Sequence, residues 1–354
     1  MLSLLAQAYA LFLTLLALGM LGISSRNYVQ EQVSNNYRPK TLVIVPCKGI
    51  DLTLEENLNS LIRQDYGNYR VVCVVDAKSD ASLPLIKKLK IDYLISGKKY
   101  PKASGKVRAI ASAIKKNKDY PVYVIADSDV TFGREWLRKI VMPLKDGSCG
   151  LSTSYPFFNP MGGFWSKVKS SWGLVGEGLM ESQITRFGWG GSLAFCREML
   201  GPRDFDFFSS SLSDDIALTA ITKKRGLKIF YRNDTDIVVN SKETFSTFFE
   251  WANRQTALSI KGNRRVFYFG VAFYLAQILL TVSGIVMAIL VSPLFILLLA
   301  PILYGIFKNY RRLRKKYPEF FAIQLFLPFI YFANLLIANS LRTIEWRGKS
   351  YELG

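Results

Sequence analysis

The 354-residue sequence contains no histidine and only four cysteines. The lack of histidine excludes Ser–His–Asp triads, Cys–His dyads and histidine-ligated zinc sites. Cys47, Cys73, Cys149 and Cys196 are far apart and form no C-x-x-C pair, so they predict neither a zinc site nor a redox motif. We expect buried free thiols, which suit a reducing compartment. Acid–base chemistry must therefore depend on carboxylates, lysines or tyrosines.

Charged residues are absent from three long stretches, residues 1–23, 266–307 and 320–341. A span of about 20 apolar residues crosses a bilayer, and uninterrupted runs of this length are not typical of a soluble domain. We expect residues 1–25 to form a retained transmembrane anchor, because the segment lacks the basic start of a cleaved signal peptide. The basic residues that follow it, from Arg26 to Lys40, favour a cytoplasmic location for the next segment.

Residues 266–341 are expected to form two or three C-terminal transmembrane helices. The first stretch is too long for one span, and Ser292-Pro293 predicts a break that turns it into a hairpin. Six basic residues in the segment 308–317 then favour a return to the cytoplasm. We expect residues 320–341 to cross the membrane, although a crossing would leave the basic tail, residues 342–354, outside. A re-entrant or surface-lying helix is the alternative.

The net charge of +19 raises the question of an anionic partner. Residues 261–354 carry 12 basic and 3 acidic residues, and these cations flank hydrophobic spans. Anionic lipid headgroups are therefore the expected counter-charge, and nucleic acid is not an expected partner. The sequence predicts a multi-pass protein of the cell membrane with a cytoplasmic catalytic domain.

The polar middle of the chain alternates apolar, β-branched runs with amphipathic segments. Strands are predicted at 41–47, 69–75, 91–96 and 122–130, and helices at 54–64, 83–90, 107–117 and 134–144, with Asp51 or Thr53 as the N-cap of the first helix. This alternation predicts an α/β domain with a mostly parallel sheet covered by helices on both faces. Ligands of such sheets bind beyond the carboxyl ends of the strands.

Acidic residues occur where this rule places a ligand. Asp76 follows one predicted strand, Asp127 and Asp129 follow another, and Asp214-Asp215 precede a helix. In an extended strand end, residues i and i+2 face the same way, so Asp127 and Asp129 can address one ligand. Two close carboxylates are favourable around a cation, and oxygen ligands suit Mg²⁺ or Mn²⁺. An acidic turn with helix-capping aspartates is the structural alternative.

Taken together and in order, these segments resemble the membrane-integrated family 2 glycosyltransferases, and most closely their ceramide glucosyltransferase-like branch. The resemblance rests on VPCKG, LEENLNSLIRQDY, VVDAKSD, SGK, ADSD, GGSLAFCR, LSDDIALTAITKKRGLKI and the tail EWRGKSYEL, which is similar to the W-R-G-x-x-Y end of the branch. It implies a GT-A fold (Rossmann-like, over residues 41–245), an interfacial amphipathic helix at 246–265, a nucleotide-diphosphate sugar donor, and inversion of the anomeric centre in one displacement.

The resemblance also implies roles for individual residues. Asp215 matches the aspartate that takes the proton of the acceptor hydroxyl, and Asp129, with Asp127, matches the ligands of Mn²⁺ or Mg²⁺. The residues implied on the nucleotide-sugar side are Pro46, Lys48, Asp76, Lys106, Asp127, Ser128 and Arg254. Those implied on the acceptor side are Gly191, Asp214, Trp251 and Gln255.

One motif departs from the family pattern. The family carries Q/R-x-x-R-W before the transmembrane hairpin, whereas this chain has WANRQ, with Trp251, Arg254 and Gln255. The arginine suits a diphosphate contact. Glutamine stands where tryptophan is expected, and Trp251, one helical turn earlier, could partly fill that space. A plain amphipathic surface helix is the alternative.

The resemblance implies an inverting, metal-dependent hexosyltransferase. The expected donor is UDP-glucose, and the expected acceptor is a membrane lipid hydroxyl, either ceramide-like or another polar lipid. A processive polysaccharide synthase and a polyprenyl-phosphate glycosyltransferase are the enzymatic alternatives. A non-catalytic scaffold or transporter is disfavoured, because the predicted spans contain no charged residue of the kind that ion-coupled transport requires.

Overall fold

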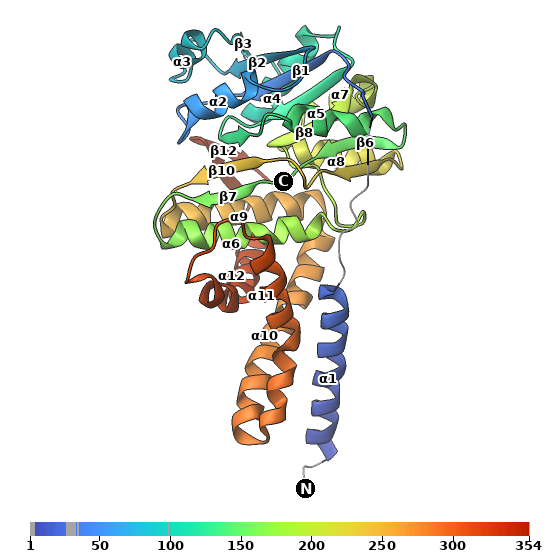
Figure 1. The fold of residues 1–354 in the computed structure, drawn as a ribbon, viewed down its shortest axis with the longest axis vertical. Coiled ribbons are helices and arrows are strands. Elements are labelled where there is room, and N and C mark those ends of the chain that lie inside the picture. The colour runs from blue at the N-terminus through green and yellow to red at the C-terminus, as the bar shows by residue number, and fades with distance from the viewer. Residues whose placement is uncertain (1–3, 26–32, 34, 98, 354) are drawn as a thin grey trace.

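The computed structural model describes residues 4–25, 33, 35–97 and 99–353. In these parts of the chain an α/β domain lies at one end of the molecule, and long helical segments extend away from it (Figure 1). Residues 1–3, Arg26 and residue 354, which belong to the predicted anchor, its basic flank and the predicted tail, lie outside the described residues.

The α/β domain is built on a seven-stranded sheet with the order β3-β2-β1-β4-β8-β6-β9. Its strands are β1 (Thr41–Pro46), β2 (Tyr69–Val75), β3 (Asp92–Ile95), β4 (Val122–Ala126), β6 (Cys149–Thr153), β8 (Ser192–Cys196) and β9 (Lys228–Tyr231). Neighbours are parallel except at β8, which is antiparallel to both β4 and β6. The predicted mostly parallel sheet is therefore confirmed, with one reversed strand inside it.

Helices cover both faces of this sheet. One face packs against α2 (Leu54–Ile62), α3 (Leu83–Lys88) and α5 (Trp136–Val141), and the other against α4 (Gly105–Lys116), α7 (Pro202–Phe208) and α8 (Asp214–Lys224). Two 3₁₀ turns, η1 (Met142–Lys145) and η2 (Arg197–Met199), follow α5 and β8. The fully buried apolar run of β4 explains its central position, since a strand covered on both faces cannot alternate with polar residues.

The start of α2 differs from the prediction. Thr53 is the N-cap residue, but it has a φ of 142° and its side chain makes no capping hydrogen bond. The hydroxyl of Thr53 donates instead to Asn57. Asp51 does not cap the helix either, because its carboxylate accepts from Ser128 at 2.5 Å and pairs with Arg347 at 2.6 Å. Asp51 therefore links the start of α2 to residues 128 and 347, which are distant in sequence.

A small second sheet lies below the main one, with the order β5-β10-β7. Its strands are β5 (Val130–Phe132), β7 (Phe157–Pro160) and β10 (Ile237–Ser241). Two long helices, α6 (Phe164–Leu179) and α9 (Phe245–Gly262), run side by side beneath it (Figure 1). The free cysteines Cys47, Cys73 and Cys149 are buried as predicted, whereas Cys196 is partly exposed.

Four helical segments of the described residues are long and apolar enough to span a membrane. They are α1 (Leu4–Ser24), α10 (Arg265–Leu290), the pair formed by η3 (Pro293–Leu299) and α11 (Ala300–Arg312), and α12 (Phe320–Ser340). The break between α10 and η3 falls at the predicted Ser292-Pro293. Leu13 and Ala17 of α1 pack against Leu280 of α10 and Leu298 of η3, so these three segments form one bundle.

The placement of α12 argues against the expected crossing of residues 320–341. Just before α12, Glu319 pairs with Lys167 of α6 at 2.7 Å, and in its last turns Asn334 donates to Asn253 of α9 at 2.8 Å. The helix therefore lies across the undersides of α6 and α9, whereas α1 and α10 point away from the domain (Figure 1). A helix that crossed a membrane would separate its ends by the width of the bilayer, but both ends of α12 contact the same domain.

The residues after α12 are more ordered than a simple tail. They form an antiparallel hairpin of β11 (Thr343–Trp346) and β12 (Lys349–Glu352), which we call the C-terminal hairpin. Ile344 and Leu353 are buried in a cluster with Ala257 and Ile260 of α9 and with Leu335 of α12. This anchoring returns the end of the chain to the α/β domain.

Candidate active site

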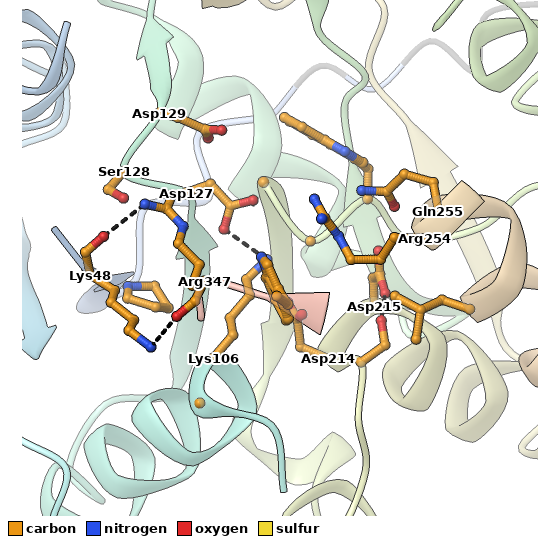
Figure 2. A pocket seen from close by; sticks show the side chains of 18 of the residues that line it. Lys48, Lys106, Asp127, Ser128, Asp129, Asp214, Asp215, Arg254, Gln255 and Arg347 are labelled. Atoms are coloured by element: carbon orange, nitrogen blue, oxygen red, sulfur yellow. Dashed lines mark hydrogen bonds and ion pairs between the residues drawn. The ribbon is translucent and has the colours of Figure 1, made fainter. Parts of the chain in front are cut away.

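A cavity of about 370 Å³ lies at the carboxyl ends of β1, β2 and β4. Pro46 ends β1, Asp76 follows β2 and Asp127 follows β4, so the three parallel strands deliver these residues to one edge of the sheet. Every candidate site residue named from the sequence lines this cavity: Pro46, Lys48, Asp76, Lys106, Asp127, Ser128, Asp129, Gly191, Asp214, Asp215, Trp251, Arg254 and Gln255. Figure 2 shows most of their side chains pointing into a common space.

Asp127, Ser128 and Asp129 occupy a tight turn between β4 and β5. The expectation that they continue an extended strand is wrong, because the backbone N–H of Val130 reaches back to the carbonyl oxygen of Asp127 at 3.4 Å. The turn still presents both carboxylates to the cavity. Burial raises the pKa of Asp127 to about 6, although the nearby Lys106 opposes that rise.

Asp129 is the more available of these two carboxylates. No hydrogen bond or ion pair to its side chain occurs among the residues that the structure describes, whereas Asp127 is paired with Lys106 at 2.7 Å. Burial and the neighbouring carboxylate of Asp51 raise the pKa of Asp129. A cation at this position would relieve both effects.

The described part of the chain contains no ready-made group of three Cys, Asp or Glu side chains that could hold a metal ion. Two carboxylates are nevertheless enough for a nucleotide-bound cation, because Mg²⁺ and similar ions are commonly held by one or two carboxylates together with phosphate oxygens and water. Asp129 and Asp127 fit that arrangement.

Lys106 lies between two acidic segments. Its Nζ atom is 2.7 Å from Oδ1 of Asp127 and 3.3 Å from Oδ2 of Asp214, which is only 3% exposed. Burial raises the pKa of Asp214 to about 7. A Cβ atom on Gly190 would lie 2.6 Å from Asp214 and 2.9 Å from Lys106, so a larger residue there would displace this pair.

Asp215 has a different environment from its neighbour. It is partly exposed and lies in the first turn of α8, where Oδ1 accepts from the backbone N–H of Ile216 at 2.7 Å and from the Ser213 hydroxyl. The second carboxylate oxygen remains available to a ligand in the cavity. Asp215 therefore has the access that a general base needs, whereas Asp214 is enclosed.

Residues of α9 form the opposite wall of the cavity. Arg254 is largely buried, with 16% of its side chain exposed, and burial lowers its pKa. Its guanidinium lies 3.5 Å from Glu250 and 6.0 Å from the centre of the Trp346 ring. Trp251 packs edge-on against Trp172, with ring centres 4.9 Å apart, and Lys169 lies over its ring at 4.5 Å. A Cβ atom on Gly191 would lie 2.3 Å from the Trp189 ring, so a larger residue there would displace this ring.

Several lining residues were not named from the sequence. Lys169 belongs to a stretch without a recognisable motif, and Trp189 directly precedes the segment GGSLAFCR. Trp346, Arg347 and Tyr351 come from the C-terminal hairpin, and the only signal for them was the W-R-G-x-x-Y pattern of the tail. Asp76 also contacts the hairpin, because Lys349 lies 3.1 Å from its carboxylate.

The family model described as "Glycosyl transferase family 21" matches residues 3–354. No curated protein shows significant sequence similarity to the chain.

Similar solved structures include the mannosyltransferase PcManGT from Pyrobaculum calidifontis in complex with GDP-Man and Mn²⁺, at 18% identity and a TM-score of 0.58, covering 94% of this chain and 97% of the other. Glucosyl-3-phosphoglycerate synthase from Mycobacterium tuberculosis, in complex with Mn²⁺, UDP and glucosyl-3-phosphoglycerate, matches at 13% identity and a TM-score of 0.44, covering 66% and 87%. The predicted GT-A type of α/β fold is confirmed.

Proposed function

Since this chain belongs to glycosyl transferase family 21, we propose that it is an inverting hexosyltransferase that moves a sugar, glucose from UDP-glucose, onto the hydroxyl of a membrane lipid. The observation that supports this most directly is the meeting of Asp76, the Asp127–Asp129 turn, Asp215 and Arg254 around one cavity. These groups can bind a nucleotide, neutralise a diphosphate and accept a proton, which are the tasks of sugar transfer from a nucleotide donor.

Each residue has a defined task in the proposed reaction. Asp76 binds the nucleoside, and Lys106 and Arg254 contribute positive charge beside the departing diphosphate. Asp129 and Asp127 would hold Mn²⁺ or Mg²⁺, which when bound neutralises charge on the leaving group. The acceptor oxygen forms a bond to the anomeric carbon while the bond from that carbon to the diphosphate breaks, and the hydroxyl proton passes to Asp215.

The apolar helices support a lipid acceptor. Large side chains on the outer face of α12, including Phe321, Phe326 and Leu336, are about half exposed or more. We infer that α1, α10 and η3–α11 cross the membrane and that α12 lies along its surface, so that α9 holds the cavity at headgroup depth. Basic residues near the end of α11 and just after it contact the α/β domain through Lys308–Glu181 and Arg314–Asp236. By the positive-inside rule, these contacts support a cytoplasmic location for this domain.

Incubation of the purified full chain with labelled UDP-glucose, a native lipid extract and Mn²⁺ tests the proposal. We expect labelled glycolipid, identified by mass spectrometry, and no product when EDTA is present. GDP-mannose serves as a second donor arm, because PcManGT was solved with GDP-Man. If only GDP-mannose gave a lipid product, the donor would be GDP-mannose and not UDP-glucose. The absence of any glycolipid with either donor would contradict the proposed function.

A further inference from the structure

The tip of the C-terminal hairpin is inserted into the donor side of the cavity. Arg347 pairs with Asp51 at 2.6 Å and donates to the carbonyl oxygen of Lys48 at 2.7 Å, while Lys48 Nζ donates back to the carbonyl oxygen of Arg347 at 2.7 Å. Two residues further on, Lys349 lies 3.1 Å from Asp76. The hairpin thus contacts the ends of β1 and β2, almost 300 residues earlier in the chain.

A third contact ties the hairpin to the start of α4. The backbone N–H of Gly105, the first residue of that helix, donates to the Tyr351 hydroxyl at 3.2 Å. Lys106 follows directly and reaches Asp127. The hairpin therefore touches three of the segments that surround the proposed donor.

The backbone of Arg347 is unusual for its residue type. Arg347 and Gly348 have φ values of 52° and 72° and form the two-residue loop between the paired Trp346 and Lys349. Two consecutive positive φ values define the type I′ turn, in which asparagine, aspartate and glycine are favoured at the first position. Arginine is disfavoured there, because its Cβ crowds the following carbonyl oxygen in the left-handed region. Residues in disfavoured backbone conformations cluster at ligand-binding sites, which points to a role for the Arg347 side chain in the cavity.

The charge around Arg347 suits a phosphate. Its guanidinium faces Asp51, and Ser128 of the Asp127–Asp129 turn donates to the same Asp51 carboxylate at 2.5 Å. With 37% of its side chain exposed, Arg347 borders the cavity beside the carboxylates that would hold the cation (Figure 2). A guanidinium has five N–H donors in a planar fork, so it can keep Asp51 on one edge and bind a phosphate with the other.

We propose that the C-terminal hairpin completes the donor site and that Arg347 binds the diphosphate of the nucleotide sugar directly. This inference rests on the proposed function, because it requires a nucleotide-diphosphate donor in the cavity. The buried anchors Ile344 and Leu353 hold the strands of the hairpin in place, so that the tip presents Arg347 to the phosphates. In the free enzyme Lys349 pairs with Asp76, and the nucleoside takes over this carboxylate when it binds.

The substitution Arg347→Asn tests the inference cleanly, because asparagine is favoured in this turn and carries no charge. Arg347→Gly is a second variant with the same two properties. Arg342→Asn is the matched control, since Arg342 is an exposed residue of the same segment and does not line the cavity. Thermal unfolding checks that all three variants remain folded.

The readout is the affinity of the purified full chain for UDP and GDP, and for uridine and guanosine, in Mn²⁺ by calorimetry and competition. For the nucleotide that the wild type binds, we expect Arg347→Asn and Arg347→Gly to weaken diphosphate binding by roughly 10- to 100-fold, the range for a lost charged hydrogen bond. Nucleoside binding and the Arg342→Asn variant should be nearly unchanged.

Other results overturn the inference in distinguishable ways. Unchanged diphosphate affinity in the Arg347 variants would contradict the contact while leaving the proposed function intact. Tighter binding would show that the hairpin blocks the site, and an equal loss for nucleoside and diphosphate would show a role in folding of the pocket only. A wild-type chain that binds neither UDP nor GDP would contradict the proposed function and this inference with it.

Discussion

The Nζ atom of Lys106 lies 2.7 Å from Oδ1 of Asp127. Lys106 is the second residue of α4, and Asp127 directly follows β4, so this ion pair joins the start of a helix to the end of a central strand. The same Nζ atom also lies 3.3 Å from Asp214 at the start of α8. The ammonium group of Lys106 therefore links the turn that is proposed to hold the metal with the helix that is proposed to carry the base.

The environment of Asp214 predicts a pH dependence of stability. Burial raises the pKa of Asp214 to about 7, so the folded protein holds this proton more tightly than the unfolded chain does. The contribution of Asp214 is therefore most favourable below about pH 4 and is lost as the pH rises through about 7. The free energy of unfolding of Asp214→Asn should therefore rise relative to that of the wild type, by about 1.4 kcal/mol for each pH unit within this interval.

Melting temperatures of both proteins between pH 4 and pH 8 measure this difference. Asp119→Asn is the control. Lys40 lowers the pKa of Asp119, so the stability that this carboxylate contributes changes only below about pH 4. A constant difference in melting temperature between Asp214→Asn and the wild type over the whole interval would contradict the raised pKa.

The metal prediction concerns Asp129. If its carboxylate holds the cation beside the diphosphate, Asp129→Asn abolishes transfer, and EDTA has the same effect on the wild type. Added Mn²⁺ or Mg²⁺ should restore the chelated wild type but not the variant. Titration of Mn²⁺ in the presence of UDP, followed by electron paramagnetic resonance, gives a readout independent of turnover. Full transfer in excess chelator would reject the assignment.

Arg254 is predicted to stabilise charge on the leaving diphosphate. Arg254→Ala should lower the transfer rate by roughly 10²-fold, as the loss of one preorganised charge contact often does. Gln255→Trp should have a mild effect, because Trp251 already packs against Trp172 on this wall. Transfer rates at saturating donor measure both effects, and an inactive Gln255→Trp beside a fully active Arg254→Ala would show that the roles on α9 are misassigned.

The arrangement of the apolar helices predicts which loops share a side of the membrane. Ser350→Cys in the C-terminal hairpin and Lys315→Cys after α11 should react with a membrane-impermeant maleimide from the same side of sealed vesicles. Leu294→Cys, at the start of η3, should react only from the other side. The native cysteines Cys47, Cys73 and Cys149 are buried, and the partly exposed Cys196 is replaced by serine in all three variants to keep the background low. If Ser350→Cys and Leu294→Cys reacted from the same side of the vesicles, the result would show that α12 crosses the membrane.

Much of the fold follows from local sequence patterns. The buried runs of β1, β2 and β4 predicted the sheet, and the acidic residues that follow β2 and β4 predicted the edge at which the cavity lies. The reversed strand β8 was not predicted, because a short apolar strand has the same pattern in either direction. Its direction is set by pairing with β4 and β6, which are distant in sequence.

The part of the site that the sequence did not predict depends on long-range contacts. Arg347 meets Asp51 across almost the whole chain, and no periodicity or spacing encodes such a meeting. The sequence also leaves the orientation of α12 open, because apolar composition is the same for a helix that crosses a membrane and for one that lies on it. Hydrogen bonds from Asn334 to α9 and from Tyr331 to α6 support the surface orientation proposed above.

The most direct test of the central claim compares Asp215→Asn with the wild type in single-turnover sugar transfer, with donor affinity measured in parallel. Asparagine can still accept the hydrogen bond from Ile216 N–H that Asp215 accepts, but it cannot take the acceptor proton. We predict near-normal donor affinity with a transfer rate lower by roughly 10²- to 10⁴-fold, the usual range for a lost general base. An Asp215→Asn enzyme that binds donor and transfers sugar at the wild-type rate would contradict the account.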